Sequence, residues 1–86
     1  MAGSQVGIAY AGMDVRRRVG LNLQQMRRVK KLSQEELAHQ AQVHQTYLSG
    51  VENGRRNPSV EVLQRIAEAL GGDLEDLAVR RPDERG

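Results

Sequence analysis

The sequence lacks cysteine, tryptophan and phenylalanine, and its only aromatic residues are Tyr10 and Tyr47. Without thiols, a disulfide framework and a thiolate metal site are both excluded, which fits a reducing compartment. His39 and His44 face different sides of a helix, so we expect surface or capping roles for them and no metal or other cofactor. In a chain of 86 residues that is 38% hydrophobic, one small aliphatic core is expected and a large catalytic cleft is not.

Long apolar runs are also missing. No stretch approaches the roughly 18 consecutive apolar residues that a membrane-spanning helix needs. Residues 1–13 are small and mildly apolar, but they have neither the basic start nor the long apolar centre of a signal peptide. We therefore expect a flexible N-terminal arm at 1–13 and a cytoplasmic protein that does not associate with membranes.

Positive and negative charges are separated along the chain. Residues 15–34 contain seven arginines and lysines and no acid, whereas residues 68–76 contain four acids and no base, although the formal net charge is only +2. A charge run of this kind is usually a solvated helix face, and it can also bind the phosphates of a nucleic acid. The charge pattern alone leaves both interpretations open.

Apolar residues recur at helical spacing in five segments, and no segment alternates as a strand would. Asp14, Ser33, Ser59 and Asp73 stand where helix N-caps are expected, and Gly71 follows the fourth segment, where a helix stops. The sequence therefore predicts an all-α, compact five-helix domain over residues 14–80 and a polar C-terminal tail at 81–86. The helices are expected at about 15–31, 34–41, 45–52, 60–70 and 74–80.

The second and third of these helices form a pair joined by a tight turn. Ser33 and Glu36 have the spacing of a capping box, in which the hydroxyl and the carboxylate each accept a hydrogen bond from a backbone N–H. In the helix at 45–52, Leu48 and Val51 face inward. The opposite side is polar, uncharged and narrow enough to fit a groove and read base edges; it consists of Gln45, Thr46, Ser49 and Gly50.

With these residues in place, residues 19–78 resemble the lambda-repressor-like, or Xre-type, helix-turn-helix domains of bacterial and phage transcriptional regulators. The resemblance rests on LSQEELA, YLSGVENGRRNPS and VLQRIAEAL, in the order typical of the family. It implies a DNA-binding domain in which the first helix of the pair lies across the DNA backbone. The recognition helix, 45–52, is then expected to enter the major groove.

The resemblance also implies roles for individual residues. Gln45 is expected to pair with adenine, and Gln34 to support Gln45. Arg27 and Glu52 match a family pair that forms a partly buried salt bridge. Base contacts are expected from Gln45, Thr46, Ser49 and Gly50, of which Gly50 supplies only close approach. Phosphate contacts are expected from Gln34, Tyr47, Asn53, Gly54, Arg55 and Arg56.

Some of these phosphate contacts have competing interpretations. Tyr47 lies beside Leu48 and Val51 on the helix, so packing of its ring is favoured, with the hydroxyl reaching toward a phosphate. Asn53 can instead cap the helix. Adjacent arginines on an exposed loop have little structural need, which favours phosphate contact for Arg55 and Arg56.

Two residues depart from the family pattern. Gln42 stands where a turn glycine is common, and a non-glycine residue there costs about 1 kcal/mol if φ is positive. His44 occupies the N-cap of the recognition helix, where serine or threonine is usual and where an imidazole accepts a hydrogen bond less readily. Both departures concern local geometry.

We expect a sequence-specific regulator of transcription, acting as a repressor on a double-stranded DNA operator and associated with the nucleoid. Family resemblance implies a homodimer, for which Leu74, Leu77 and Val79 are candidate interface residues. Alternatives of the same fold are an antitoxin with a toxin partner and the controller of a restriction-modification system. A protein-interaction module without DNA binding would lack the nearby cations, and an enzyme is not expected, since no acid–base pair sits in an evident cleft.

Overall fold

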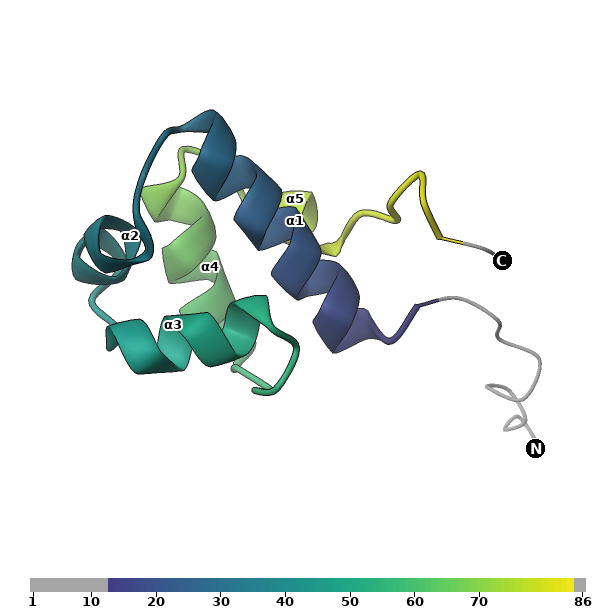
Figure 1. Ribbon diagram of the computed structural model, residues 1–86, viewed down its shortest axis with the longest axis horizontal. Coiled ribbons are helices and arrows are strands. Elements are labelled where there is room, and N and C mark those ends of the chain that lie inside the picture. Colours follow the sequence, from purple (N-terminus) through teal and green to yellow (C-terminus); the bar gives the residue numbers. More distant parts are fainter. Residues whose placement is uncertain (1–12, 85–86) are drawn as a thin grey trace.

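A computed structural model describes residues 13–84, which form five helices and no strand. In chain order these are α1 (Val15–Val29), α2 (Gln34–Ala41), α3 (Gln45–Glu52), α4 (Val60–Ala69) and α5 (Leu74–Ala78) (Figure 1). The predicted all-α, five-helix architecture is therefore confirmed. The expected arm at 1–13 lies outside the described residues except for Met13.

The helix starts follow the predicted caps. The Asp14 carboxylate accepts a hydrogen bond from the backbone N–H of Arg16 at 2.8 Å, and the Ser59 hydroxyl accepts one from Val62 at 3.2 Å. Ser33 and Glu36 form the complete capping box, with distances of 3.0 and 2.8 Å. The backbone N–H of Ser33 lowers the pKa of the Glu36 carboxyl by stabilising its charged form.

The end of α1 was predicted at about Lys31 but lies at Val29. Lys31 takes a left-handed conformation with φ of 58°, and its backbone N–H donates to Arg28 O. The next N–H, from Leu32, donates to Arg27 O at 3.1 Å, which completes a Schellman-type helix end. The left-handed residue after a helix is usually glycine, and here it is Lys31. Neither a glycine nor a break in the apolar spacing therefore indicated that α1 ends at Val29.

The core lies where the five helices meet. Helix α1 packs against α3 and α5, α4 packs against α2 and α5, and α2 packs against α3. The largest fully buried side chains are those of Leu23, Leu37, Leu48, Ile66, Leu77 and Val51. The expectation that Leu77 belongs to a dimer interface is therefore wrong, because Leu77 is fully enclosed in the monomer core.

None of the helices within residues 13–84 combines the length and apolar character needed to cross a bilayer.

Residues 81–84, the described part of the expected polar C-terminal tail, lie against α1. Arg81 donates from Nη1 to Asn22 Oδ1 on α1 at 2.9 Å, and Asn22 in turn donates to the carbonyls of Leu77 and Val79. The Arg18 guanidinium holds the Glu84 carboxylate with two hydrogen bonds of 2.8 Å, and this carboxylate is fully buried. The segment after α5 is thus fastened to the first half of α1.

This attachment makes stability depend on acid pH. Hydrogen bonds from Arg18 and from the backbone N–H of Arg81 hold the pKa of Glu84 at about 2, below its usual 4.5. The stabilisation is therefore fully present above about pH 4.5 and is lost as the pH falls toward 2. We expect Glu84→Gln to lower the melting temperature by several degrees near neutral pH and the difference from wild type to shrink across this range.

Thermal unfolding followed by circular dichroism over a pH series measures this difference. Asp83→Asn is the matched control, because Asp83 pairs with Arg81 at the exposed surface, where an ion pair contributes little. A Glu84→Gln difference that stays constant down to the acid limit would contradict the assignment.

Candidate nucleic-acid interface

The turn between α2 and α3 rests on one residue in a left-handed conformation. Gln42 has φ of 60° and ψ of 46°, and the next backbone N–H, from Val43, donates to Ala38 O at 3.0 Å. A glutamine in this region costs about 1 kcal/mol relative to glycine. The predicted departure at Gln42 is thus a real backbone strain, and it sets the direction in which α3 leaves the turn.

Helix α3 starts without a side-chain cap. His44 is the N-cap residue in extended conformation, and its side chain makes no capping hydrogen bond, as its identity suggested. The N–H groups of the first turn therefore receive no acceptor from His44, and the positive end of the helix dipole stays open to an anion.

The outer face of α3 contains three of the four predicted groove residues. Gln45 and Thr46 are exposed and Ser49 is half-buried. Gly50, expected to allow close approach of DNA, is buried, and a Cβ placed on it would lie 2.7 Å from Cγ of Arg56. The Arg56 side chain covers the backbone here, so direct approach to Gly50 requires Arg56 to move.

The C-terminal end of α3 is held by the predicted salt bridge. Arg27 donates to both carboxylate oxygens of Glu52, from Nε at 2.7 Å and from Nη2 at 3.0 Å, and the Glu52 side chain is only 3% exposed. The remaining guanidinium nitrogen, Nη1, donates to Leu32 O at 3.0 Å. The hydrogen bonds to Glu52 raise the pKa of Arg27 by stabilising its charged form.

Gln34 belongs to this buried pair. Its Nε2 donates to Glu52 Oε1 at 2.9 Å, and no hydrogen bond joins it to Gln45 within residues 13–84. The expected support of Gln45 by Gln34 is therefore absent. Gln34 instead connects the start of α2 to the end of α3, so α1, α2 and α3 all meet at the Glu52 carboxylate.

The backbone of α3 also lies directly on α1. A Cβ placed on Gly20 would lie 2.4 Å from Glu52 O and 2.7 Å from Val51 O, so only glycine permits this approach. Gln24, one turn further along α1, donates from Nε2 to Glu52 O at 2.8 Å. Sequence reasoning missed Gln24, although Gly20, Gln24 and Arg27 follow the i, i+4, i+7 spacing of one helix face.

The loop after α3 begins with a glycine-dependent helix end. Gly54 has φ of 73°, and the Arg55 backbone N–H donates to Gly50 O at 2.8 Å. Asn53 is the C-cap residue, and its Nδ2 donates to Ser49 O at 2.9 Å. Its side chain therefore caps the helix in this structure, which is the alternative to a phosphate contact. The loop is thus pinned to the last turn of α3.

The two arginines of this loop differ in their contacts. Arg55 is exposed, and its side chain has no partner among the residues that the structure describes. The Arg56 guanidinium lies over the Tyr47 ring, 5.5 Å from its centroid, a cation–π contact. Little structural need was expected for either arginine, and Arg56 does have this one structural contact. The Tyr47 ring packs against the core, as expected from its position.

Residues 23–77 match the Helix-turn-helix family HTH_3. The chain belongs to this family. The predicted resemblance to Xre-type helix-turn-helix domains is thereby confirmed, and α2 and α3 are the two helices of the motif.

Several known proteins share this helix-turn-helix domain. The uncharacterized HTH-type transcriptional regulator y4dJ of Sinorhizobium fredii is 49% identical over 59 residues, which cover 69% of this chain and 77% of that protein. The control protein C.BamHI of Bacillus amyloliquefaciens is 38% identical, covering 74% and 80%. The solved restriction-modification controller protein C.AhdI of Aeromonas hydrophila has a TM-score of 0.70 and 35% identity, covering 72% of this chain and 94% of that one.

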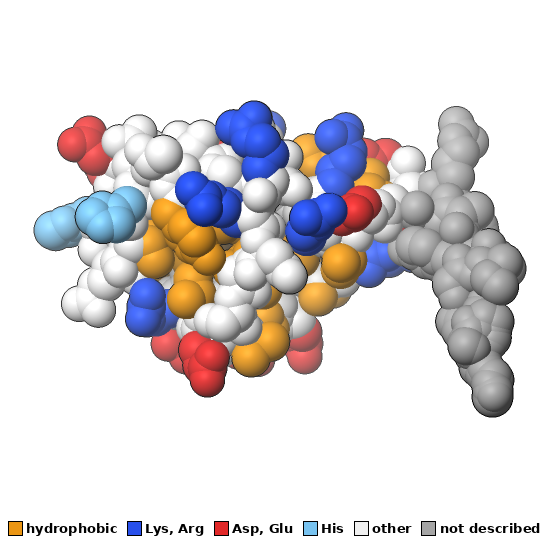
Figure 2. All heavy atoms as spheres, turned by 90° about the horizontal axis from the view of Figure 1, so that it is seen from below, with side chains coloured by type: hydrophobic (Ala, Val, Ile, Leu, Met, Phe, Trp, Pro, Cys, Tyr) orange, Lys and Arg blue, Asp and Glu red, His pale blue; other side chains and the backbone are white. Residues whose placement is uncertain are grey.

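Positive charge borders the recognition helix on this side of the molecule. Figure 2 views the face that points downward in Figure 1, where α3 lies, and shows a hydrophobic patch with Lys and Arg side chains mostly along its upper edge, Asp and Glu side chains at its lower edge, and histidine at one end. The exposed arginines nearest to α3 along the chain are Arg55 and Arg56, and Glu52, its only acid, is buried and paired. The polar face of the helix-turn-helix is thus bordered by cations without competing acids on α3 itself.

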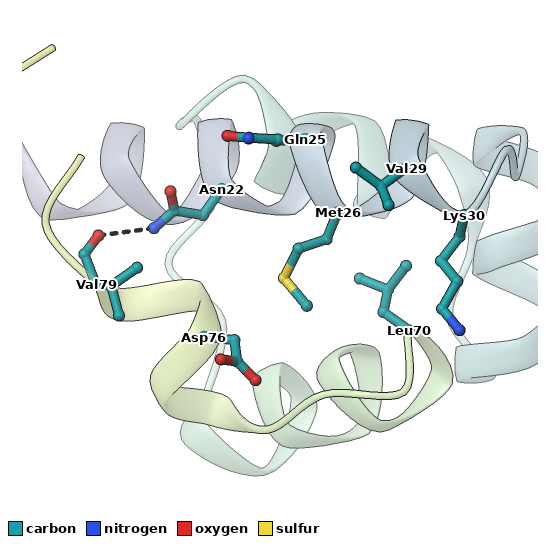
Figure 3. Close-up of a pocket in the computed structure, with 8 residues that line it drawn as sticks. All are labelled: Asn22, Gln25, Met26, Val29, Lys30, Leu70, Asp76 and Val79. Atoms are coloured by element: carbon teal, nitrogen blue, oxygen red, sulfur yellow. Dashed lines mark hydrogen bonds between the residues drawn. The ribbon is translucent and has the colours of Figure 1, made fainter. Parts of the chain in front are cut away.

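A separate hollow of about 350 Å³ lies between α1 and the α4–α5 region. Figure 3 shows Met26 pointing into it from α1, with Leu70 opposite and Val29 and Val79 on its edges. Val29 is 75% exposed and Val79 is 53% exposed. Within residues 13–84 no cluster of side chains suited to a metal ion was found, in this hollow or elsewhere.

Proposed function

We propose that this helix-turn-helix protein is a transcriptional repressor that binds a double-stranded DNA operator as a homodimer, in the cytoplasm and on the nucleoid. The observation that carries the proposal is the outer face of α3, whose exposed residues are polar and uncharged. The C-terminal end of this helix is held in place by hydrogen bonds that α1 and α2 donate to Glu52. A helix held this firmly and bordered by arginines suits entry into the major groove. Occupying an operator in this way excludes other proteins from it.

Base reading falls to the exposed side chains of α3. The Gln45 amide can donate to N7 and accept from N6 of adenine once rotated to face the groove, a bidentate pattern that discriminates among bases. The Thr46 and Ser49 hydroxyls can donate or accept at neighbouring base pairs. Gly50 contributes close approach only where Arg56 turns away from it.

Phosphate contacts fall to the residues around this face. Gln34 keeps a second amide N–H beyond the one given to Glu52, and the Tyr47 hydroxyl and the Asn53 amide are further candidate donors from α3 and its C-cap. Backbone N–H groups near Gly54 and the side chains of Arg55 and Arg56 complete the set. These contacts would fix the register of the protein on DNA without selecting a sequence.

Replacing Gln45 by alanine tests the reading role. We expect Gln45→Ala to weaken binding to the preferred site by about 1 to 3 kcal/mol and to leave binding to mixed-sequence DNA nearly unchanged. Fluorescence anisotropy on the two duplexes measures both values. Gln40→Ala, at an exposed glutamine of α2 whose side chain makes no hydrogen bond among the described residues, is the matched control. Equal losses on both duplexes would remove the specificity role from Gln45.

The experiment that tests the function itself is selection of the purified protein against a random duplex pool at near-physiological salt. Enrichment of an inverted repeat, with half-sites about one helical turn apart, is expected for a dimer. Enrichment of a single half-site would support sequence-specific DNA binding and contradict the dimer. A pool that shows no enrichment would contradict the sequence-specific regulator.

The surface of the dimer is best sought beside α5. Because Leu77 is buried, the remaining exposed apolar residue of the original candidates is Val79, which borders the hollow in Figure 3 together with Val29. Leu74 is half-buried. A Val79→Glu substitution that left the protein dimeric in analytical ultracentrifugation would exclude this surface.

A second candidate function is control of a restriction-modification system. It is favoured by the likeness to C.AhdI, of which this chain covers 94% at 35% identity, so the match extends over nearly the whole of that controller. The selected operator would separate the two candidates, because a controller regulates the genes of a restriction enzyme and its methyltransferase. An operator remote from such genes would exclude the controller and favour the general repressor.

A further inference from the structure

The first turn of α1 touches the loop that follows the recognition helix. A Cβ placed on Gly54 would lie 3.3 Å from Cα and 3.4 Å from N of Arg17, so the two backbones are in direct contact. Arg16 and Arg56 line the same small hollow of about 100 Å³, together with Asn57 and Pro58. In Figure 1 the loop after α3 accordingly lies beside the start of α1, shown in purple.

This contact brings two pairs of adjacent arginines together from distant parts of the chain. Arg16 and Arg17 come from α1, and Arg55 and Arg56 come from the loop. Arg16 is engaged with Asp14 at 3.4 Å and Arg56 with Tyr47. Arg17 and Arg55 are exposed and have no side-chain partner within residues 13–84, so their charges are available to a ligand.

We infer that Arg17 is a DNA phosphate contact, which together with Arg55 extends the backbone-binding surface of the recognition helix onto the first turn of α1. The inference rests on the proposed function and adds to it a part of the molecule that precedes the matched family region, residues 23–77. Because Arg17 touches the loop after α3 at Gly54, we expect its phosphate to flank the bases read by Gln45.

Two features of the site favour a nucleic-acid backbone over another anion. Arg17 and Arg55 come from separate elements, are exposed and line neither of the two hollows described above, so their guanidinium groups are open to a long ligand. The acid nearest in sequence to Arg17 is Asp14, already hydrogen-bonded to Arg16, so it offers Arg17 only weak competition. An exposed pair of arginines with planar donors suits successive phosphates along a strand.

Salt-dependent binding to a mixed-sequence DNA duplex tests this inference without knowledge of the operator. Each phosphate contact contributes about 0.9 to the slope of log binding constant against log salt concentration. We expect Arg17→Ala to lower the slope by about one on both mixed-sequence and selected duplexes, and Arg17→Lys to restore most of it. Arg80→Ala is the charge-matched control, since Arg80 is exposed, follows α5 and has no partner among the described residues.

The outcomes separate the inference from the function on which it rests. Wild-type protein that binds neither duplex would contradict the proposed function. Wild-type binding with a slope that Arg17→Ala and Arg80→Ala reduce equally would overturn the inference alone, because the effect would then be general charge. Melting temperatures within about a degree of wild type for both variants would show that lost binding is not lost folding.

Discussion

Replacing Glu52 by alanine is expected to destabilise the domain by about 3 to 5 kcal/mol, because it leaves the Arg27 guanidinium largely buried without its counter-ion. Two hydrogen bonds from Arg27 and one from Gln34 end on this carboxylate, and the Glu52 side chain is 3% exposed. The free energy of unfolding of a native protein is only roughly 5 to 15 kcal/mol, so a loss of this size removes much of the stability. Urea unfolding of wild type and Glu52→Ala measures it.

Glu35→Ala is the matched control, since Glu35 is an exposed carboxylate on α2. A surface carboxylate of this kind contributes no more than about 1 kcal/mol, so the control should unfold near the wild-type midpoint. If Glu52→Ala unfolded at the same urea concentration as Glu35→Ala, the Arg27–Glu52 pair would not be a structural element of the fold.

The salt bridge is also expected to position α3, which a double substitution can separate from stability. Apolar replacement of both partners of a buried ion pair is often neutral or stabilising, so Arg27→Met with Glu52→Leu should recover much of the stability. The double variant should nevertheless discriminate less well between the selected operator and mixed-sequence DNA, because the directional hydrogen bonds to α3 are gone. Stability and specificity both at wild-type level would show that packing alone orients the helix.

The helices, their caps and the turn could be predicted because their determinants lie within a few residues of each other. The capping box of Ser33 and Glu36 links residues three positions apart, and Gly71 takes a left-handed conformation where the fourth helix was expected to stop. Even the strained turn at Gln42 could be located. Local hydrogen bonds of this kind are encoded by spacing, which a single sequence displays directly.

Contacts between distant segments were predicted only where a family pattern supplied them. The Arg27–Glu52 pair came from such a resemblance. Gln34 was assigned to Gln45 and instead bonds Glu52, since several acceptors lie within reach of one long side chain. Arg18 and Glu84 are 66 positions apart, and nothing in the spacing of residues 81–84 distinguishes a docked segment from a solvated one. The cover that Arg56 forms over Gly50 depends on loop geometry in the same way.

Gly20→Ala is expected to destabilise the protein by about 2 kcal/mol or more, although alanine is the better helix former by about 1 kcal/mol. The added methyl would lie 2.4 Å from Glu52 O and 2.7 Å from Val51 O, and neither carbonyl can rotate away as a side chain would. Helix α1 must therefore move off α3, which stretches the hydrogen bond from Gln24 to Glu52 O and the salt bridge from Arg27. Urea unfolding gives the stability, and binding to the selected operator should fall as well.

Gly50→Ala separates this effect from the general response of a helix to losing a glycine. Both glycines are buried within helices, but the Cβ at Gly50 would meet Cγ of Arg56, in a long exposed side chain that can shift. The gain in helix propensity should then roughly offset the weakened contact with Tyr47, so Gly50→Ala should unfold within about 1 kcal/mol of wild type. Equal urea midpoints for Gly20→Ala and wild type would mean that α1 and α3 leave room for a methyl group, although a Cβ at Gly20 would lie 2.4 Å from Glu52 O. Side chains alone would then hold the recognition helix in place.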